Sequence, residues 1–352
     1  MPGRQVGPRI LEIWTGVACP LNCRFCYRHG KDFERAGDLL EPSGLTDLLR
    51  EFASGGGEEV YLSGGLEPLT RPHAAARVVG EAKRVGLRVQ VYTNGVPPAL
   101  AAGYLPGVLA READQVRVSL PAATELTYRE VTRPVAATAT FARACGTVDR
   151  LLKLSKDSGN GARVGVSFLV VERNARELDA AARLWRDRGA AFLNVRVDAE
   201  GVLSCGAEVR DAIASLRHEA NAGRYRPLEI DFFSGGVLSH AERCIAFHNK
   251  VTVDPFGLVF VCCRQAQPGA RPDWAQVGDL RVERFGQVIQ RLQTVPPLRH
   301  CARCTPYESW FNRQAQQGTA THQEPATEEK EVALRSAVWV PGQVNSNKPR
   351  VR

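Results

Sequence analysis

Three cysteines near the amino end, Cys19, Cys23 and Cys26, constrain this chain more than any other feature. They are separated by three and then two residues, and they follow an apolar run, Ile10–Trp14, that is typical of a buried strand. Three thiolates on one short loop can bind three irons of a [4Fe–4S] cluster and leave the fourth iron without a protein ligand. A structural zinc site is normally closed by four ligands, often as two separated pairs. The triplet therefore favours an iron–sulfur cluster with one open iron, and a zinc loop or an unrelated thiol cluster is the alternative.

The same loop carries a family resemblance. Its pattern, C-x3-C-x-Φ-C with Phe25 as the aromatic residue, resembles the signature loop of the radical S-adenosylmethionine (radical SAM) superfamily. In that family the open iron binds the amino and carboxylate groups of SAM, and an electron from the cluster cleaves SAM to a radical that abstracts hydrogen from the substrate. The resemblance implies that the three cysteines bind the cluster, that Phe25 lies beside SAM, and that a flavodoxin- or ferredoxin-type protein donates the electron.

Length and composition limit the broad class of protein. A chain of 352 residues can form one large α/β domain and a smaller one. Ten cysteines without a charged-then-apolar leader favour metal binding inside the cell over disulfides. No apolar run is long enough for a membrane helix, so we expect a cytoplasmic protein with no membrane partner. The formal net charge is +8, but no basic block or nucleic-acid motif accompanies it, and no nucleic-acid partner is expected.

A glycine pair follows the second expected strand. Gly64 and Gly65 have no Cβ, so the backbone there can approach a ligand closely, and the carboxylate of Glu67 can accept a hydrogen bond from an ammonium group. The run from Gly64 to Pro68 resembles the superfamily motif that binds the amino group of SAM.

Two later strand ends resemble other parts of the family's SAM site. Thr93 and Asn94 resemble the edge that contacts the ribose, although a plain strand–turn junction explains them equally well. Ser119 and Arg133 match in placement a serine and an arginine that the family uses on the ribose and carboxylate of SAM. Arg129 competes with Arg133 for the second role.

The chain alternates between strand and helix patterns from Ile10 onwards. Six strands alternating with helices predict parallel β–α units with right-handed crossovers. Six units are too few for a closed eight-stranded barrel, so we predict an α/β fold that is an open, partial (β/α)6 TIM-like barrel, with functional residues at the carboxyl ends of the strands. After the first strand, the next expected strand begins at residue 58 and runs into the glycine turn at Gly64. The later expected strands are 87–93, 116–120, 163–171 and 192–197, and the expected helices are 45–53, 72–85, 138–154 and 177–188.

A second group of cysteines lies near the carboxyl end: Cys244, Cys262 or its neighbour Cys263, Cys301 and Cys304. Between its members, the run 251–261 predicts a β-hairpin with Asp-Pro-x-Gly as the turn. Four thiolates can bind a [4Fe–4S] cluster, and the same pattern suits a zinc ion.

The second group resembles the auxiliary-cluster region called SPASM in its seven-cysteine form and twitch in its four-cysteine form. The distance to Gly257 favours Cys262 as a ligand. Trp310 and Gln314 occupy positions where the longer form has further cysteines, so the resemblance implies one auxiliary [4Fe–4S] cluster. We expect a radical SAM barrel over 1–200, a connection over 201–243, the auxiliary-cluster domain over 244–312 and a disordered tail over 313–352.

The resemblance implies hydrogen abstraction from a small polar substrate. Twitch-bearing relatives include aminocyclitol dehydrogenases and aminoglycoside sugar epimerases, so we expect oxidation, epimerisation or decarboxylation of a sugar, aminocyclitol or glycoside in antibiotic biosynthesis. Arg196 would bind a substrate hydroxyl or carboxylate, or else pair with Asp198. Cys205 or Cys263 could return a hydrogen atom in an epimerisation.

Two other functions stay open. A maturase of a ribosomally made peptide would act on a precursor peptide, but only a short segment precedes Ile10 and leaves little room for a peptide-recognition domain. An iron–sulfur protein without turnover would not need the Gly64-Gly65-x-Glu67 motif.

Overall fold

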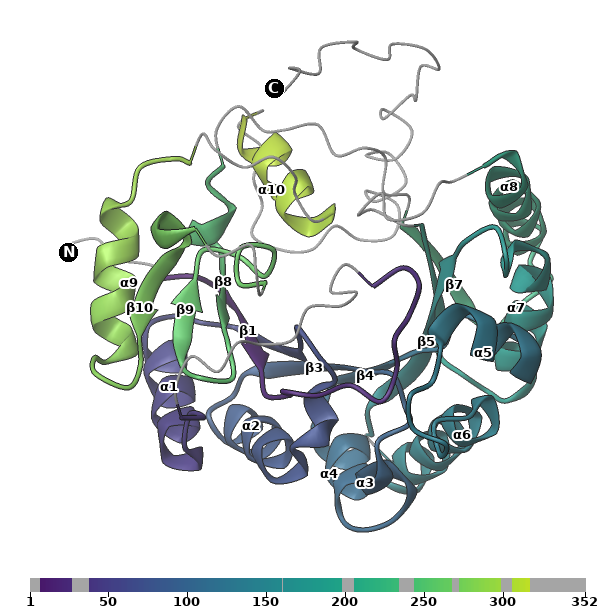
Figure 1. The fold of residues 1–352 in the computed structure, drawn as a ribbon, viewed down its shortest axis with the longest axis horizontal. Helices are drawn as coiled ribbons and strands as arrows, with labels where there is room; N and C mark the ends of the chain where they lie inside the picture. Colours follow the sequence, from purple (N-terminus) through teal and green to yellow (C-terminus); the bar gives the residue numbers. More distant parts are fainter. Residues whose placement is uncertain are drawn as a thin grey trace, which may run out of the picture.

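The chain folds into an arc in which one sheet carries helices along its outer side (Figure 1). The computed structural model describes residues 7–26, 38–159, 161–197, 206–233, 244–267, 272–298 and 306–316. Within these residues the sheet has ten strands in the order β10-β9-β8-β1-β2-β3-β4-β5-β6-β7. Neighbouring strands from β8 through β1 to β7 are parallel, and β9 and β10 are antiparallel to their neighbours.

The strands and helices have the following bounds. The strands are β1 (Ile10–Trp14), β2 (Glu59–Ser63), β3 (Arg88–Thr93), β4 (Gln115–Ser119), β5 (Arg163–Val170), β6 (Phe192–Val197), β7 (Glu229–Phe233), β8 (Lys250–Val253), β9 (Leu258–Phe260) and β10 (Gln276–Asp279). The helices are α1 (Pro42–Ser54), α2 (Pro72–Arg84), α3 (Pro98–Ala101), α4 (Leu105–Glu112), α5 (Glu125–Thr132), α6 (Phe141–Asp157), α7 (Leu178–Asp187), α8 (Ala207–Asn221), α9 (Phe285–Thr294) and α10 (Pro306–Gln316). No helix of the described segments is both long enough and apolar enough to cross a membrane.

The predicted α/β architecture is confirmed, and the six expected strands form as β1 to β6 within one or two residues of their predicted ends. The expected hairpin also forms, as β8 and β9. Its turn is stabilised by Asp254, whose Oδ1 accepts hydrogen bonds from the backbone N–H groups of Phe256 (2.9 Å) and Leu258 (3.0 Å). Gly257 has a φ of 86°, a conformation that favours glycine.

The sheet extends further than the sequence suggested. The segment expected only as an extended connection forms β7, a seventh parallel strand beside β6. The hairpin expected in a separate small domain joins the same sheet, because β8 pairs with β1 and places Lys250 opposite Ile10. Helix α10 ends at Gln316, so it crosses the expected start of the tail at residue 313. The sequence pattern does not reveal the pairing of β8 with β1 because it joins segments far apart in the chain.

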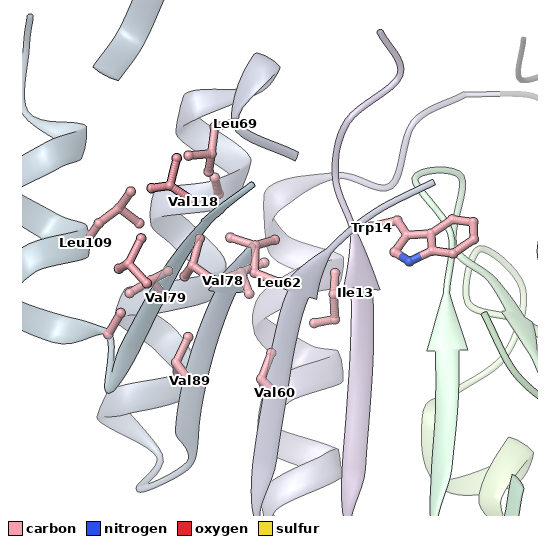
Figure 2. Close-up of a cluster of buried hydrophobic side chains, with 14 of the residues drawn as sticks. Ile13, Trp14, Val60, Leu62, Leu69, Val78, Val79, Val89, Leu109 and Val118 are labelled. Carbon is pink, nitrogen blue, oxygen red and sulfur yellow. The ribbon is translucent and has the colours of Figure 1, made fainter. Parts of the chain in front are cut away.

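Alternation along the strands separates a core from an inner face. In β3 and β4 every second residue is buried and the residues between are partly exposed. The buried set packs against the outer helices, and Figure 2 shows Val60, Leu62, Val89 and Val118 gathered with Val78 and Val79 of α2 in one apolar cluster. The other set faces the inner side of the arc, where the functional residues are expected.

The inner face is aromatic and charged. A series of ring contacts crosses it. Lys250 Nζ lies 5.5 Å from the centre of the Tyr61 ring, and the centres of the Tyr61 and Tyr92 rings are 5.8 Å apart. The Arg117 guanidinium lies 4.7 Å from the centre of the Tyr92 ring and 5.9 Å from that of Phe192. These side chains come from β8, β2, β3, β4 and β6, so the strands on both sides of the arc present cationic and aromatic groups to one interior.

Candidate functional site

The first cysteine loop continues directly from β1 and is fixed by the residues around the end of α5. The backbone N–H of Asn22 donates to the carbonyls of Thr132 (3.0 Å) and Arg133 (3.1 Å), and the N–H of Arg24 donates to Val131 (3.0 Å). Arg133 ends α5 in the left-handed conformation, with a φ of 47°, and its side chain is exposed. The role of Arg133 toward SAM stays a prediction; its backbone already supports the loop.

The three cysteines share a poorly solvated environment. Burial, then the charges of Glu67 and Cys26, raise the pKa of the Cys19 thiol to about 12. Burial and the charges of Cys19 and Cys26 raise the pKa of Cys23 well above its usual value. Thiols that raise one another's pKa in this way need positive charge to become thiolates, and cluster irons supply it. The donor set therefore fits an iron–sulfur cluster.

Single-ion binding fits the described residues less well. Among them, no three His, Cys, Asp or Glu side chains converge as ligands of one metal ion. Each thiolate of a [4Fe–4S] cluster binds a different iron, so cluster ligands are spread apart and need not converge on a point.

The loop that follows β2 lies directly against the cysteine loop. A Cβ added at Gly16 would lie 1.9 Å from the carbonyl oxygen of Glu67, so only glycine allows this approach. The backbone N–H of Glu67 donates to the carbonyl of Ala18 (3.1 Å) and ties the two loops together. At Gly64 a Cβ would lie 2.6 Å from the carbonyl oxygen of Leu66, which explains one glycine of the Gly64–Gly65 pair.

The side chain of Glu67 is buried, at 4% exposed, and receives three hydrogen bonds from the protein. Its carboxylate accepts from the backbone N–H of Leu69 (3.1 Å), from Thr93 Oγ1 (2.7 Å) and from the backbone N–H of Asn94 (2.7 Å). Burial raises the pKa of Glu67 to about 7, against the lowering effect of these hydrogen bonds. Glu67 thus joins the ends of β2 and β3, a role that the sequence did not indicate, and its contact with a SAM ammonium stays a prediction.

Asn94 connects this network to the cluster loop. Its Nδ2 donates to the Sγ of Cys19 at 3.5 Å, and its Oδ1 accepts from the backbone N–H of Val96 at 3.1 Å. The structure therefore brings Cys19, Glu67, Thr93 and Asn94 together at the carboxyl ends of β1, β2 and β3. Their predicted contacts with SAM, and those of Phe25, Gly65 and Ser119, stay predictions.

Comparison with known families decides the identity of this region. The model of the Radical SAM superfamily matches residues 15–184, which include the cysteine loop, Glu67, Asn94 and Ser119. Residues 15–184 are a radical SAM domain. The cysteine loop lies within this domain of an enzyme superfamily, and the binding of a cluster by Cys19, Cys23 and Cys26 stays a prediction.

Two curated relatives match parts of the chain. The chain is 29% identical over 215 residues to dTDP-4-amino-4,6-dideoxy-D-glucose ammonia-lyase of Streptomyces venezuelae, covering 56% of this chain and 41% of the lyase. It is 39% identical over 86 residues to 7-carboxy-7-deazaguanine synthase of Hyperthermus butylicus, covering 24% and 34%. The chain therefore spans less than half the length of either relative.

Two solved structures bound to SAM share the fold. Streptococcus suis SuiB has a TM-score of 0.61 at 14% identity, covering 80% of this chain and 65% of SuiB. Native anSMEcpe has a TM-score of 0.57 at 12% identity, covering 88% and 98%. At these identities the likeness shows the fold alone.

Outside the matched radical SAM region, the second cysteine group is described in part. Cys244 forms an antiparallel bridge with Leu298, and Cys262 and Cys263 follow β9. Burial raises the pKa of Cys262 to about 12, with Glu308 and Cys244 among the charges that add to the shift, and the pKa of Cys263 is also raised by burial. Cys301 and Cys304 lie outside the described residues, as do Cys205 and Asp198. Metal binding by Cys262 or Cys263 stays a prediction.

Helix α10 supports Cys244 through Asn312, a residue that the sequence did not indicate. Asn312 is fully buried; its Nδ2 donates to Cys244 Sγ at 3.3 Å, and its Oδ1 accepts from the backbone N–H of Ile245 at 2.8 Å. Phe311 packs beside Cys244 and Ala246 in a small apolar cluster. The helix that follows the C-x2-C pair thus packs back onto the first cysteine of its group.

A buried ion network, also missed by the sequence, connects α10 to the barrel. Lys250 on β8 is 5% exposed, and its Nζ lies 2.8 Å from Glu12 on β1 and 3.1 Å from Glu308 on α10. Glu12 also accepts from Ser63 Oγ (2.6 Å) and Trp14 Nε1 (3.0 Å). Burial opposes ionisation of Glu12, but Lys250 and these hydrogen bonds outweigh it and lower its pKa.

Polar residues also form a row across the inner face. Ser119, Ser167, Asn194 and Asp231 are register partners on β4, β5, β6 and β7. Asn194 is 1% exposed and its Nδ2 donates to Asp231 Oδ2 at 2.9 Å, whereas its Oδ1 accepts no hydrogen bond from the described residues. Arg196, predicted to bind substrate, lies on β6 two residues beyond Asn194, and its role stays a prediction.

Proposed function

We propose that this chain is a radical SAM enzyme that abstracts a hydrogen atom from a small polar substrate, namely a sugar, aminocyclitol or glycoside of antibiotic biosynthesis. The outcome would be oxidation, epimerisation or decarboxylation. The observation that carries the proposal is the association of Cys19 with Asn94 and Glu67 within a radical SAM domain.

The substrate class is supported by two further observations. One relative is an ammonia-lyase named for an amino sugar nucleotide, and it aligns with 56% of this chain. The inner face carries Arg117, Asn194 and Asp231, which suits a ligand rich in hydroxyl, amino or acidic groups more than an apolar one.

The protein's own part would be to bind, orient and enclose. When bound, the cluster and SAM supply a radical that abstracts hydrogen. Cys19, Cys23 and Cys26 would hold the cluster, and the loop from Gly64 to Glu67 would bring backbone groups close to SAM. Polar side chains of the inner face would hold one substrate C–H bond toward SAM, since positioning governs such a reaction.

The proposal includes one auxiliary [4Fe–4S] cluster held by Cys244, Cys262, Cys301 and Cys304, which would accept an electron from the substrate. Its support is the cysteine pattern together with the charge of Cys244, which adds to the raised pKa of Cys262. A flavodoxin- or ferredoxin-type protein would reduce the first cluster.

The test is anaerobic reconstitution followed by iron counting and SAM cleavage under dithionite. Two four-iron clusters predict about eight irons per chain, and release of 5′-deoxyadenosine is expected. Ring-deuterated dTDP-4-amino-4,6-dideoxy-D-glucose and ring-deuterated aminocyclitols would then be supplied as candidate substrates. Transfer of deuterium into 5′-deoxyadenosine from one of them would support the substrate class, and transfer only from a peptide would contradict it.

Two cysteine variants make the test specific. Cys23→Ala should abolish SAM cleavage because it removes one of three cluster ligands. Cys145→Ala is the matched control: Cys145 is buried on α6, apart from both cysteine groups, and its loss should leave SAM cleavage intact. SAM cleavage at the native rate by the Cys23 variant would contradict the assignment.

A further inference from the structure

One thiol of each cysteine group accepts a hydrogen bond from an asparagine amide. Asn94 Nδ2 lies 3.5 Å from Cys19 Sγ, and Asn312 Nδ2 lies 3.3 Å from Cys244 Sγ. Each asparagine is far from its cysteine in sequence, so each contact depends on the folded sheet or on the docking of α10.

The backbone fixes the orientation of both amides. Asn94 Oδ1 accepts from the N–H of Val96, and Asn312 Oδ1 accepts from the N–H of Ile245. Rotating either amide by half a turn would place its NH2 group against a backbone donor. The amide N–H must therefore face the sulfur in both places.

A hydrogen bond to a cluster thiolate withdraws electron density from the sulfur and favours the more electron-rich, reduced cluster. We propose that Asn94 and Asn312 are positioning residues that orient Cys19 and Cys244 and raise the reduction potential of the cluster that each thiol binds. The proposal for Asn312 rests on the auxiliary cluster of the proposed function, whereas the proposal for Asn94 needs only the radical SAM cluster.

The two contacts differ in strength. Asn312 is fully buried and Asn94 is partly exposed. A hydrogen bond gains electrostatic strength where water is excluded. Loss of Asn312 should therefore shift the reduction potential of the auxiliary cluster further than loss of Asn94 shifts that of the radical SAM cluster.

The experiment is an EPR-monitored redox titration of the full-length, reconstituted protein and of the variants Asn94→Leu and Asn312→Leu. Leucine is close in size to asparagine and has no donor and no charge. Each variant should lower the potential of one cluster and leave the other unchanged, so each serves as the control for the other. Resonance Raman spectroscopy should show a shifted Fe–S(Cys) stretch in the same cluster, a readout that does not depend on turnover.

If a leucine variant does not retain iron, the corresponding aspartate variant, Asn94→Asp or Asn312→Asp, is titrated in its place. Aspartate keeps the oxygen that accepts from Val96 or Ile245 and removes the amide donor. A variant with native iron content and an unchanged potential overturns the proposal for that residue. About four irons per chain and a single reduction potential in the wild type would contradict the auxiliary cluster and the proposal for Asn312. The proposal for Asn94 would still be tested by its own variants.

Discussion

At Gly16 the absence of one carbon atom determines how the cysteine loop meets the loop that follows β2. The carbonyl of Glu67 occupies the space that a side chain at Gly16 would need, and the Glu67–Ala18 hydrogen bond depends on this approach. The Glu67 carboxylate in turn accepts hydrogen bonds from Thr93 and Asn94, so the position of Glu67 also affects the end of β3. Sequence reasoning named Glu67, Thr93 and Asn94 as site residues from motif placement, but it could not identify Gly16, because a glycine before a cysteine loop carries no sign of what will pack against it.

Gly16→Ala should therefore separate the loops. Because the clash is with backbone atoms, the loops must shift, which should destabilise the protein by about 1–3 kcal/mol and reduce SAM cleavage. Urea unfolding and 5′-deoxyadenosine release are the measurements. The matched control is Gly146→Ala on α6, where an added Cβ has no neighbour within 4 Å and alanine should stabilise the helix by up to about 1 kcal/mol. Equal effects of the two substitutions would contradict this account.

Glu67 should also make the free energy of unfolding depend on pH. Its ordinary pKa of 4.5 is raised to about 7 by burial, so the folded protein keeps a proton that the unfolded chain releases between these values. Unfolding free energy should therefore fall as the pH rises from about 4.5 to about 7 and then level off, and Glu67→Gln should lack this fall. Urea unfolding at about pH 5 and about pH 8, on samples of matched iron content, compares the two proteins. A difference between them that does not change with pH would count against the raised pKa.

At the scale of elements, the structure depends on two contacts that periodicity cannot predict. The strand and helix pattern predicted β1 to β6 and the hairpin because local alternation and turn residues encode them. The pairing of residues 20–24 with the end of α5, and the packing of α10 on Cys244, join segments far apart in the chain. The sequence also gives no sign that Glu12 and Lys250 form an ion pair, because they come together only when β8 pairs with β1.

The Lys250 network should be one of the larger single contributions to stability. Lys250→Met removes the cation between two buried carboxylates, Glu12 and Glu308, and should cost about 3–5 kcal/mol. Adding Glu12→Gln and Glu308→Gln should recover part of this loss, because the buried charges are then gone. Lys83→Met is the control, since its ion pair with Asp114 is exposed and should be worth about 0–1 kcal/mol. Urea unfolding measures all three, and a loss no larger than that of Lys83→Met would mean that the network is weak.

For the whole molecule, the decisive feature is that β8 returns to β1. The first strand of the chain is an internal strand of the ten-stranded sheet, with β2 on one side and β8 on the other (Figure 1). A count of β–α units along the sequence predicts the parallel sheet but cannot show that the segment after residue 243 covers the edge of β1. The radical SAM region and the hairpin that leads to Cys262 and Cys263 therefore share one sheet.

A fragment comparison tests this dependence. A fragment that ends at residue 243 would expose β1 as an edge strand and leave Glu12 buried without Lys250, so it should be insoluble or bind the dye ANS strongly. A fragment that ends at residue 316 keeps β8, β9, β10 and α10 and should stay soluble, with one cooperative unfolding transition. If the shorter fragment were soluble and unfolded with the same midpoint as the longer one, the radical SAM region would be an independent domain and the pairing of β8 with β1 would contribute little to its stability. The expected result is the opposite, because the charge on Lys250 and the hydrogen bonds of β8 both come from outside that region.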